Sequence, residues 1–387
     1  MEYIEGENVL IRVLQVLEGI NENSGVSSVV MNYYDHMETE KIMFDFMIHS
    51  DIREDTRREI EKRGSKIYRM PSLSGKNIPR YIKALNRFWE EHRGEYQIVH
   101  GHLPNAAVFY LGIAGKYGCP VRILHSHNSR GADGTVKRIR NYILNRWGVR
   151  TANTYFACSK LAAEYLFGKR KAEKAHIIYN AIELKKFAYN PQIRQELRRK
   201  YHVEDKVVIG HVGRFQEQKN HTFIIELAQN LAKKQEYVFV LLGDGPLRKN
   251  IEQSIERCDL QDQVKILGVV KNPQDYYQMM DIFILPSLYE GLPVVGVEAQ
   301  AAGLSCILSD RITEEVLVAE NIHRLSIADA AAWAEKIREM TDDRVANMQR
   351  LEEAGFSIER EALRLEQLYQ NIVEGAYGKN RGLCGNA

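Results

Sequence analysis

The 387-residue chain is long enough for two domains, and 44% hydrophobic with 27% charged residues is an ordinary composition for a folded globular protein. Its formal net charge of +2 argues against a dedicated nucleic-acid binder, which is usually strongly basic on one face. The five cysteines are scattered and lack CxxC spacing, so neither a disulfide framework nor a cysteine zinc site is expected. No apolar run has the length of a membrane-spanning helix, and the acidic N-terminus does not resemble a signal peptide. We therefore expect a cytoplasmic protein.

In the first half of the chain, strand-like runs rich in β-branched residues alternate with longer helical patterns. The expected strands are residues 9–17, 44–49, 66–70, 98–102, 121–125, 154–158 and 176–179. The expected helices include residues 26–36, 53–63, 78–92, 106–116 and 137–149. Because strands and helices alternate, we expect a parallel sheet with helices on both faces.

The first strand leads through a loop of small residues, which ends at Ser24 and Gly25, into a helix. Backbone in such a loop can approach a diphosphate or an acceptor closely, which makes Gly25 a candidate contact. The loop has neither the GxGxxG fingerprint of a dinucleotide site nor the Gly-Lys-Ser/Thr of a P-loop. An ordinary connecting loop is an equally good interpretation.

Two histidine pairs end two of the expected strands, His100-Gly-His102 and His125-Ser-His127. Alternation along a strand places the members of each pair on one face. They resemble zinc ligands only superficially, because no third ligand follows at helical or CxxC spacing. His127 lies at the start of a loop, where it could contact a sugar or an acceptor; a structural role is the alternative. For His102, a functional role and a structural role are equally good interpretations.

Residues 137–150 form a basic stretch without acidic residues. Its cations are Lys137, Arg138, Arg140, Arg146 and Arg150, and its apolar residues are Ile139, Tyr142, Ile143 and Trp147. The apolar spacing predicts a helix with one apolar face and cationic flanks, which could rest on an anionic membrane surface. The alternative is a helix that packs on the core and keeps its basic face in solvent.

Residues 188–205 are dense in charge and poor in core residues, which indicates a linker between domains. We therefore expect an N-terminal domain over residues 1–190 and a C-terminal domain over residues 205–357. The last segment, residues 358–387, should form an amphipathic helix that ends near residue 372, could pack back on the N-terminal domain, and continues into a loose tail.

The second half repeats the alternation. Its expected strands are residues 207–212, 238–242, 264–267, 282–285 and 306–309, and its expected helices are residues 221–234, 246–257, 274–279 and 294–302. Short, nearly continuous apolar strands suit a parallel sheet that is buried on both faces. The chain is thus predicted to be an α/β protein of two Rossmann-like domains.

Two cations five residues apart, Arg214 and Lys219, follow the strand at 207–212. At a strand end they could clamp a pyrophosphate, because arginine offers a planar fork and lysine a compact charge. Gly213 lets the backbone approach the same ligand. Solvated surface charges are the alternative. The later turn at Gly243-Asp-Gly245 is either another ligand-facing joint or an ordinary tight turn.

The most informative segment is Pro286-Ser-Leu-Tyr-Glu290-Gly-Leu-Pro293, which separates an apolar strand from a helix. Ligands of open α/β sheets bind outside the carboxyl ends of strands, so Glu290 should face a ligand there. Glu298 should lie one turn into the helix, where it could bind a ribose diol, and the helix N-terminus suits a diphosphate. Two ordinary surface glutamates are the alternative.

Several segments together resemble the retaining glycosyltransferases of family four, which have the GT-B fold, especially those of bacterial capsular and exopolysaccharide clusters. The segments are Asn23-Ser-Gly25-Val, Val99-His-Gly-His102, His125-Ser-His127-Asn, Val212-Gly-Arg214-Phe with Gln218-Lys219-Asn220, Gly243-Asp-Gly-Pro, and Pro286 to Pro293 continued to Glu298-Ala. The resemblance spans almost the whole chain. Departures occur at Asn180-Ala-Ile-Glu183, where Asn-Gly-Ile-Asp is usual, and at Gly303-Leu-Ser305, where Gly-x-Pro is usual.

The resemblance implies two Rossmann-like domains that face each other across a cleft, with the nucleotide-sugar donor on the C-terminal side and a glycan or lipid-linked acceptor on the N-terminal side. Arg214 and Lys219 would hold the diphosphate, Glu298 the ribose and Glu290 the transferred sugar. His127 would lie near that sugar. Backbone at Gly213, and from Gly291 and Leu292 to Val294 and Val295, would contact sugar and phosphate, and Gly25 would serve the same donor.

The family resemblance further implies a UDP-linked hexose or N-acetylhexosamine donor, retention of the anomeric configuration, and no cofactor or catalytic metal. The protein could work peripherally at the inner face of the cell membrane. One alternative is a sugar-nucleotide 2-epimerase, which would need no acceptor. Another is a non-catalytic partner subunit, and a nicotinamide dehydrogenase lacks its glycine fingerprint.

Overall fold

The computed structural model describes residues 10–21, 24–72, 77–129, 135–231, 236–340 and 343–384. The chain divides into two compact units: the first unit comprises Met1–Tyr179 and Ile358–Ala387, and the second unit comprises Asn180–Ser357. The division follows Tyr179, earlier than the predicted domain end at residue 190. Residue 9, Asn23, residues 232–234 and residues 385–387, which were assigned above to a strand, a motif, a helix and a tail, lie outside the described residues.

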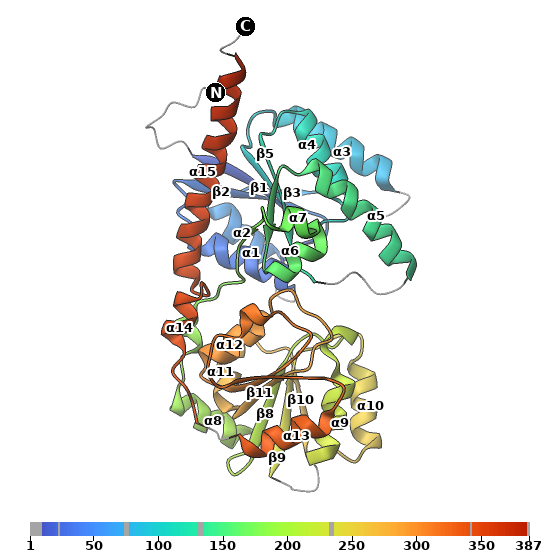
Figure 1. The fold of residues 1–387 in the computed structure, drawn as a ribbon, viewed down its shortest axis with the longest axis vertical. Helices are drawn as coiled ribbons and strands as arrows, with labels where there is room; N and C mark the ends of the chain where they lie inside the picture. The colour runs from blue at the N-terminus through green and yellow to red at the C-terminus, as the bar shows by residue number, and fades with distance from the viewer. Residues whose placement is uncertain are drawn as a thin grey trace. The chain divides into compact units, whose positions relative to one another are not determined.

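The first unit contains a seven-stranded parallel sheet in the order β3-β2-β1-β4-β5-β6-β7 (Figure 1). Its strands are β1 (Ile11–Leu17), β2 (Ile42–Ile48), β3 (Ile67–Arg69), β4 (Ile98–Gly101), β5 (Val121–Ser126), β6 (Thr154–Ala157) and β7 (His176–Ile177). The register pairs Val13 with both Phe44 of β2 and Ile98 of β4. Strand order reverses between β1 and β4, and ligands of such sheets bind at the carboxyl ends beside this switch point.

Helices cover this sheet and join its strands. They are α1 (Gly25–His36), α2 (Glu54–Lys62), α3 (Ile78–Glu91), α4 (Ala107–Lys116), α5 (Thr135–Thr151), α6 (Lys160–Phe167), α7 (Lys169–Ala172) and α15 (Ile358–Cys384). The C-terminal helix α15 packs against α1 and reaches β5. It is longer than the predicted helix, because it continues beyond residue 375, where a loose tail was expected.

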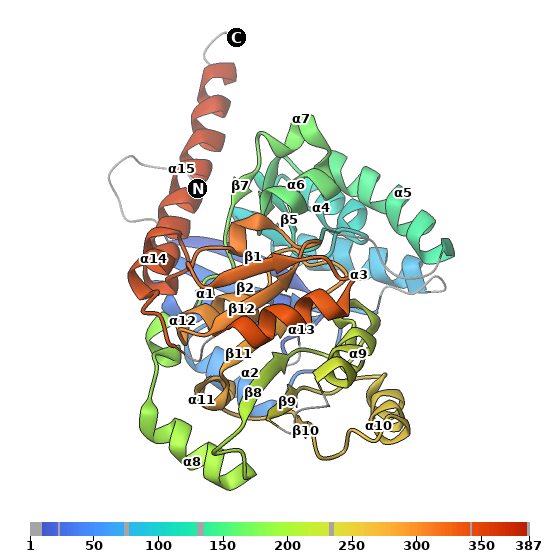
Figure 2. The same cartoon turned by 60° about the horizontal axis from the view of Figure 1, so that its bottom comes forward.

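The second unit contains a six-stranded parallel sheet in the order β10-β9-β8-β11-β12-β13. Its strands are β8 (Val207–Val212), β9 (Tyr237–Leu242), β10 (Val264–Gly268), β11 (Ile282–Leu285), β12 (Ser305–Ser309) and β13 (Ile322–Leu325). The order reverses between β8 and β11, which are neighbours in this sheet (Figures 1 and 2). Two Rossmann-like parallel sheets confirm the predicted fold class.

The helices of the second unit surround this sheet. They are α8 (Pro191–Tyr201), α9 (His221–Leu231), α10 (Arg248–Arg257), α11 (Pro273–Met279), α12 (Val294–Ala301), α13 (Ala330–Glu339) and α14 (Met348–Glu353), with short 3₁₀ turns η2 (Leu184–Phe187), η3 (Glu217–Lys219) and η4 (Glu314–Val316). Trp333 of α13 and Phe215 are fully buried in the core that these helices form with the sheet.

The segment predicted to be a linker is instead helix α8, which packs on α11 in the second unit. Asn190 caps its N-terminus by accepting hydrogen bonds from the backbone of Gln192 and Ile193. The charges that suggested a solvated linker are paired: Arg194 and Arg198 both bind Asp281, whose side chain is buried. The linker prediction was therefore wrong because these arginines pack inward.

Helix α5 packs one face on α4 and exposes the other. Gly148 brings the two helices together, because a Cβ there would lie 2.8 Å from Ala107 Cβ and 2.9 Å from the Pro104 carbonyl oxygen. Large apolar side chains nevertheless face solvent; these are Val136, Ile139, Tyr142, Ile143 and Trp147. The predicted apolar face is thus not buried in the first unit, which excludes the core-facing interpretation of residues 137–150 within that unit.

Candidate active site

The switch point of the second sheet carries the predicted cation loop. Directly after β8, the exposed Arg214 follows Gly213 and precedes the buried Phe215. A Cβ on Gly213 would lie 3.0 Å from Lys219 Cε, so glycine leaves room for the lysine side chain beside the strand end. The sequence expectation that Arg214 and Lys219 belong to one loop at this strand end is therefore met in the structure.

The turn at Gly243-Asp-Gly245 packs against the backbone of this loop. The φ of Gly243 is +133°, and a Cβ there would lie 2.1 Å from the Gly213 carbonyl oxygen. A Cβ on Gly245 would lie 2.5 Å from the Phe215 carbonyl oxygen, and the Phe215 amide donates to the Asp244 carbonyl oxygen at 2.9 Å. These glycines allow two backbones to touch, which gives the turn a packing role beneath Arg214.

Lys219 and Glu290 form a close ion pair that joins the two loops of the switch point. Lys219 ends the turn η3, and its Nζ lies 2.7 Å from Glu290 Oε1. Gln218 Nε2 donates to Glu290 Oε2 at 3.1 Å and to the Tyr289 carbonyl oxygen at 2.9 Å. The Glu290 residue is only 8% exposed. Its carboxylate is thus held by two side chains from the β8 side of the sheet.

The segment after Glu290 leads directly into α12. Gly291 and Leu292 are buried, and Asn180 Nδ2 fixes the Leu292 carbonyl oxygen at 2.7 Å. Pro293 is the N-cap of α12 and provides no side-chain cap, and the first turn contains no acidic residue. Val294 and Val295, both half-buried, begin the helix. A helix N-terminus without an anionic cap is suited to bind the oxygen atoms of a phosphate group.

Glu298 lies in the second turn of α12, where the sequence predicted it. Its Oε2 accepts a hydrogen bond from the buried Tyr277 hydroxyl at 2.7 Å. Burial raises the pKa of Glu298, while the Tyr277 hydroxyl and the positive charge of Lys219 act in the opposite direction. Lys219 therefore acts on both candidate ligand-binding carboxylates, as the ion-pair partner of Glu290 and as a positive charge that favours the ionised form of Glu298.

In the first unit, Gly25 is the first residue of α1, and Ser24 caps the helix by accepting from the Ser27 amide at 3.3 Å. A Cβ on Gly25 would meet no described atom within 4 Å. Packing among the described residues therefore does not require glycine at this position, and the absence of a side chain keeps the approach to the helix N-terminus open.

His127 follows β5 and is half-buried. Its Nε2 lies 2.8 Å from His102 Nδ1, and its ring stacks on that of His125 with 4.0 Å between centroids. Burial lowers the pKa of His127 to about 3, so the side chain is neutral at physiological pH. His127 is thus held as part of a cluster of imidazole rings rather than alone at a loop.

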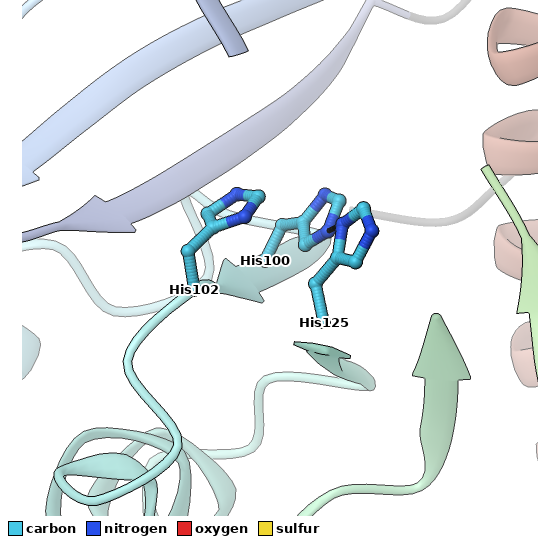
Figure 3. Close-up of side chains that lie close together, drawn as sticks. All are labelled: His100, His102 and His125. Carbon is cyan, nitrogen blue, oxygen red and sulfur yellow. Dashed lines mark hydrogen bonds between the residues drawn. The ribbon is translucent and has the colours of Figure 1, made fainter. Parts of the chain in front are cut away.

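The cluster also contains His100, His102 and His125, each with a ring nitrogen within 4.8 Å of the others (Figure 3). A bound zinc ion needs nitrogen lone pairs that converge on one point about 2.0–2.1 Å away. Here His100 Nε2 lies 3.0 Å from His125 Nδ1, the ring centroids are 5.2 Å apart and the planes differ by 12°. These two nitrogens face each other head-on, which is the geometry of a hydrogen bond rather than of two ligands to one metal.

Sequence reasoning missed several residues that hold these sites. Gln218 lies next to Lys219 in the motif, so its proximity to the site could have been found. Gln15 interrupts an apolar stretch of β1, which was an available but weak signal, whereas Tyr277 lies in the polar helix α11, where nothing in the sequence singles it out. Tyr369 of α15 hydrogen-bonds to His100, and no sequence spacing could connect residues so far apart.

Comparisons with known proteins agree with this architecture. The family described as "Glycosyltransferase Family 4" matches residues 23–186, and the family described as "Glycosyl transferases group 1" matches residues 193–357. EpsF of Bacillus subtilis (strain 168), a glycosyltransferase by name, is 36% identical over 334 residues, which cover 84% of this chain and 86% of EpsF.

A second relative is the UDP-Gal:alpha-D-GlcNAc-diphosphoundecaprenol alpha-1,3-galactosyltransferase of Escherichia coli, 28% identical over 52% of this chain and 55% of that protein. Among solved structures, Anabaena HepE in complex with UDP superimposes with a TM-score of 0.75 at 17% identity, over 94% of this chain and 100% of HepE. The sucrose-phosphate synthase of Thermosynechococcus elongatus gives the same score and coverage. This chain belongs to the family 4 glycosyltransferases and has their GT-B fold.

Proposed function

We propose that this glycosyltransferase is a retaining, metal-independent enzyme that moves a hexose or N-acetylhexosamine from a UDP-sugar to a glycan or lipid-linked acceptor in the synthesis of exopolysaccharide or capsular polysaccharide. The observation that carries the proposal is the Lys219–Glu290 pair at the switch point, beside Arg214 and the N-terminus of α12. Two cations and a helix N-terminus suit a diphosphate, and a carboxylate next to them suits a sugar.

Names of relatives support the donor and acceptor classes. The E. coli relative is named for a UDP-galactose donor and a diphosphoundecaprenol acceptor, and HepE was solved with UDP and with UDP-glucose. EpsF, which is 36% identical to this chain, is named as a glycosyltransferase, which supports sugar transfer as the reaction.

In this mechanism Arg214 and Lys219 stabilise the leaving diphosphate, backbone at Gly213 and from Gly291 to Val295 contacts donor oxygens, and Glu298 binds the ribose diol. The acceptor oxygen bonds to the anomeric carbon as the bond from that carbon to the diphosphate breaks, and the acceptor proton passes to the diphosphate. For the first unit, we propose the roles that the family resemblance implies: a ligand contact at the Gly25 backbone and a contact of His127 with the transferred sugar or the acceptor.

The Lys219–Glu290 pair adds a step before chemistry. Without donor, the lysine charge is neutralised by Glu290 at 2.7 Å. An incoming diphosphate competes for Lys219, and this competition releases a Glu290 oxygen to accept a hydrogen bond from a sugar hydroxyl. Donor binding would therefore prepare the carboxylate that contacts the transferred sugar.

The test uses the full chain with UDP-glucose, UDP-galactose and their N-acetylhexosamine counterparts, each with and without an undecaprenyl-diphosphate-linked sugar acceptor. One donor should raise the melting temperature and yield a product with retained anomeric configuration, and excess EDTA should not lower the rate. Conversion of the donor without acceptor would favour the epimerase alternative, and an inverted product or loss of rate with EDTA would contradict the mechanism.

Arg214→Ala should weaken UDP binding by about 10- to 100-fold, because charge-assisted hydrogen bonds to phosphate contribute roughly 1.5–3 kcal/mol. Arg214→Lys should recover only part of the affinity, since lysine lacks the planar fork. Isothermal titration with UDP measures both, and the exposed Lys271→Ala in the same unit is the matched control. Unchanged affinity of Arg214→Ala would remove this residue from the donor site.

We also propose that α5 holds the enzyme on an anionic membrane at the inner face of the cell membrane. Val136, Ile139, Ile143 and Trp147 recur at helical spacing on one exposed face, with Arg140, Arg146 and Arg150 around them. Among the described residues no helix is long and apolar enough to cross a bilayer. A surface-bound helix would bring the active site to a lipid-linked acceptor.

The full chain should bind vesicles containing phosphatidylglycerol but not neutral vesicles. Trp147 is 51% exposed, whereas Trp89 and Trp333 are buried, so a blue shift in tryptophan fluorescence would report α5 itself. Replacing Arg140, Arg146 and Arg150 by glutamine should weaken binding by roughly 100-fold, at about 1 kcal/mol per cation. Val269→Ser, at an exposed apolar residue of the second unit, should bind like the original chain, and binding by the triple variant at full strength would refute the proposal.

A further inference from the structure

Four histidines in and directly after β4 and β5 are arranged as a ladder, here named the histidine ladder: His100, His102, His125 and His127. Two head-on pairs cross between the strands, His100 with His125 at 3.0 Å and His102 with His127 at 2.8 Å. The pairs stack on each other along the strands, with ring centroids 4.4 Å apart for His100 and His102 and 4.0 Å apart for His125 and His127. Strand alternation explains the stacking. The register places His100 opposite Ile123, so the pair of His100 with His125 is diagonal and joins His100 to the residue two positions beyond its register partner.

All four rings are neutral at physiological pH, because burial lowers the pKa of each. A neutral imidazole has one nitrogen that donates and one that accepts. Each hydrogen bond of the ladder therefore fixes which nitrogen of the next ring carries the proton. A residue that hydrogen-bonds to one ring of the ladder therefore determines the tautomers of the other rings in the same chain of hydrogen bonds.

Two residues from other elements connect the two pairs. Gln15 of β1 accepts at Oε1 from His102 Nε2 at 2.8 Å, and its Nε2 donates to the Tyr369 hydroxyl at 3.4 Å. The Tyr369 hydroxyl, from α15, lies 2.7 Å from His100 Nδ1. Gln15 and Tyr369 thus connect His102 to His100 by a continuous series of hydrogen bonds through the core of the first unit.

These contacts form one chain of hydrogen bonds with a single direction. Because the Gln15 oxygen can only accept, His102 carries its proton on Nε2 and accepts at Nδ1 from His127 Nε2–H. From Gln15 the direction continues through the Tyr369 hydroxyl to His100 and then to His125. The chain ends at His125 Nε2, which is buried and has no hydrogen-bond partner in the described structure.

We propose that Gln15 and Tyr369, acting through His102, hold His127 as the Nε2–H tautomer, so that its Nδ1 is presented as a hydrogen-bond acceptor for a hydroxyl group of the transferred sugar or of the acceptor. Gln15, His102 and Tyr369 are positioning residues in this assignment, which rests on the proposed function of His127. Recognition would require a hydroxyl on the substrate, because an acceptor nitrogen cannot pair with a second acceptor.

The chain of hydrogen bonds ends at a buried nitrogen, His125 Nε2, that has no hydrogen-bond partner among the described residues. A buried polar atom without a partner costs roughly 1–3 kcal/mol. Reversal of the Gln15 amide would reverse every hydrogen bond of the chain. His127 Nδ1 would then carry the proton and donate instead of accepting, so the direction has a measurable consequence.

The test is long-range ¹H–¹⁵N NMR of the full chain labelled at histidine, with signals assigned by comparison with His127→Gln. His102 and His127 should both show the Nε2–H pattern. Gln15→Met, which removes the acceptor, and Tyr369→Phe, which frees the Gln15 amide to rotate, should each give mixed tautomers at His127. Tyr33→Phe is the matched control, because it deletes a buried hydroxyl that binds the Tyr179 carbonyl oxygen outside the ladder.

The same variants separate this inference from the proposed function. Gln15→Met and Tyr369→Phe should lower kcat by about tenfold and leave UDP affinity, a property of the second unit, unchanged. An Nδ1–H pattern at His127, an unchanged pattern in both variants, or one equivalent of zinc that is lost in His100→Gln would overturn the tautomer assignment. Absence of transfer by the original chain, with the expected NMR patterns, would instead contradict only the proposed function.

Discussion

Glu290→Gln should lower kcat for sugar transfer by about a thousandfold, which corresponds to roughly 4 kcal/mol of transition-state stabilisation. The glutamine keeps the shape of the side chain and can still accept from Gln218, which now binds Glu290 Oε2 at 3.1 Å. It loses the negative charge that, in the proposed mechanism, faces the reacting sugar. Positive charge develops at the anomeric carbon during transfer, so this charge matters most in the transition state.

The same substitution should not weaken donor binding. Lys219 lies 2.7 Å from the Glu290 carboxylate and, in the proposed mechanism, exchanges it for the diphosphate. Removing the competing charge should leave UDP affinity equal or higher. Titration with UDP and steady-state kinetics together therefore give opposite signs for binding and turnover.

Glu217→Gln is the matched control, because Glu217 is an exposed glutamate in the same turn as Lys219. Its turnover should equal that of the original chain. If Glu290→Gln retained more than a tenth of the original kcat, the assignment of Glu290 to the reacting sugar would be abandoned.

Asp281→Ala should destabilise the second unit by about 3 kcal/mol. The buried carboxylate binds Arg194 and Arg198 and accepts from the Val208 amide at 2.7 Å. Its removal leaves two poorly solvated cations without an anion, and breaking a buried ion pair from one side costs roughly 3–5 kcal/mol. Carbonyl oxygens that also bind these arginines, such as that of Met279, keep the expected value at the lower end.

Hydrogen exchange measured by mass spectrometry distinguishes this effect from a general loss of fold. Amides of the second unit should lose protection in Asp281→Ala, whereas those of the first unit should not. Glu314→Ala, which removes an exposed carboxylate paired with Arg324, should change protection by less than about 1 kcal/mol. Equal protection in Asp281→Ala and Glu314→Ala would show that the α8 arginines do not depend on this carboxylate.

All strands of the first sheet and all strands of the second except β13 could be predicted, mostly because their apolar runs are short and rich in β-branched residues. The predicted strand at residues 282–285 has the observed bounds of β11. By contrast, α8 was missed because buried arginines and solvated arginines cannot be told apart in the sequence, so its high charge indicated a linker. Helix α13 was missed too. Strand β13 was missed because it is a half-exposed edge strand whose sequence, Ile322-His-Arg-Leu325, has no apolar run.

The candidate site, too, could be predicted only in part from the sequence. Motif spacing placed Arg214, Lys219, Glu290 and Glu298 at the carboxyl edge of one sheet, because parallel strands end at a common edge. Spacing could not show that Lys219 pairs with Glu290, since that contact depends on the path of two loops. Nor could it show the bond between His100 and Tyr369, which joins residues 269 positions apart.

The first unit is discontinuous in sequence, and this order affects how a nascent chain can fold. The ribosome completes the second unit before it makes α15, so the first sheet lacks its last helix during most of translation. Until then, the surface that Tyr369 covers through ring contacts with Phe44 and Phe156 stays uncovered. Chaperones that shield exposed apolar surface would therefore bind the uncovered face of the first sheet until α15 has been made and packs on it.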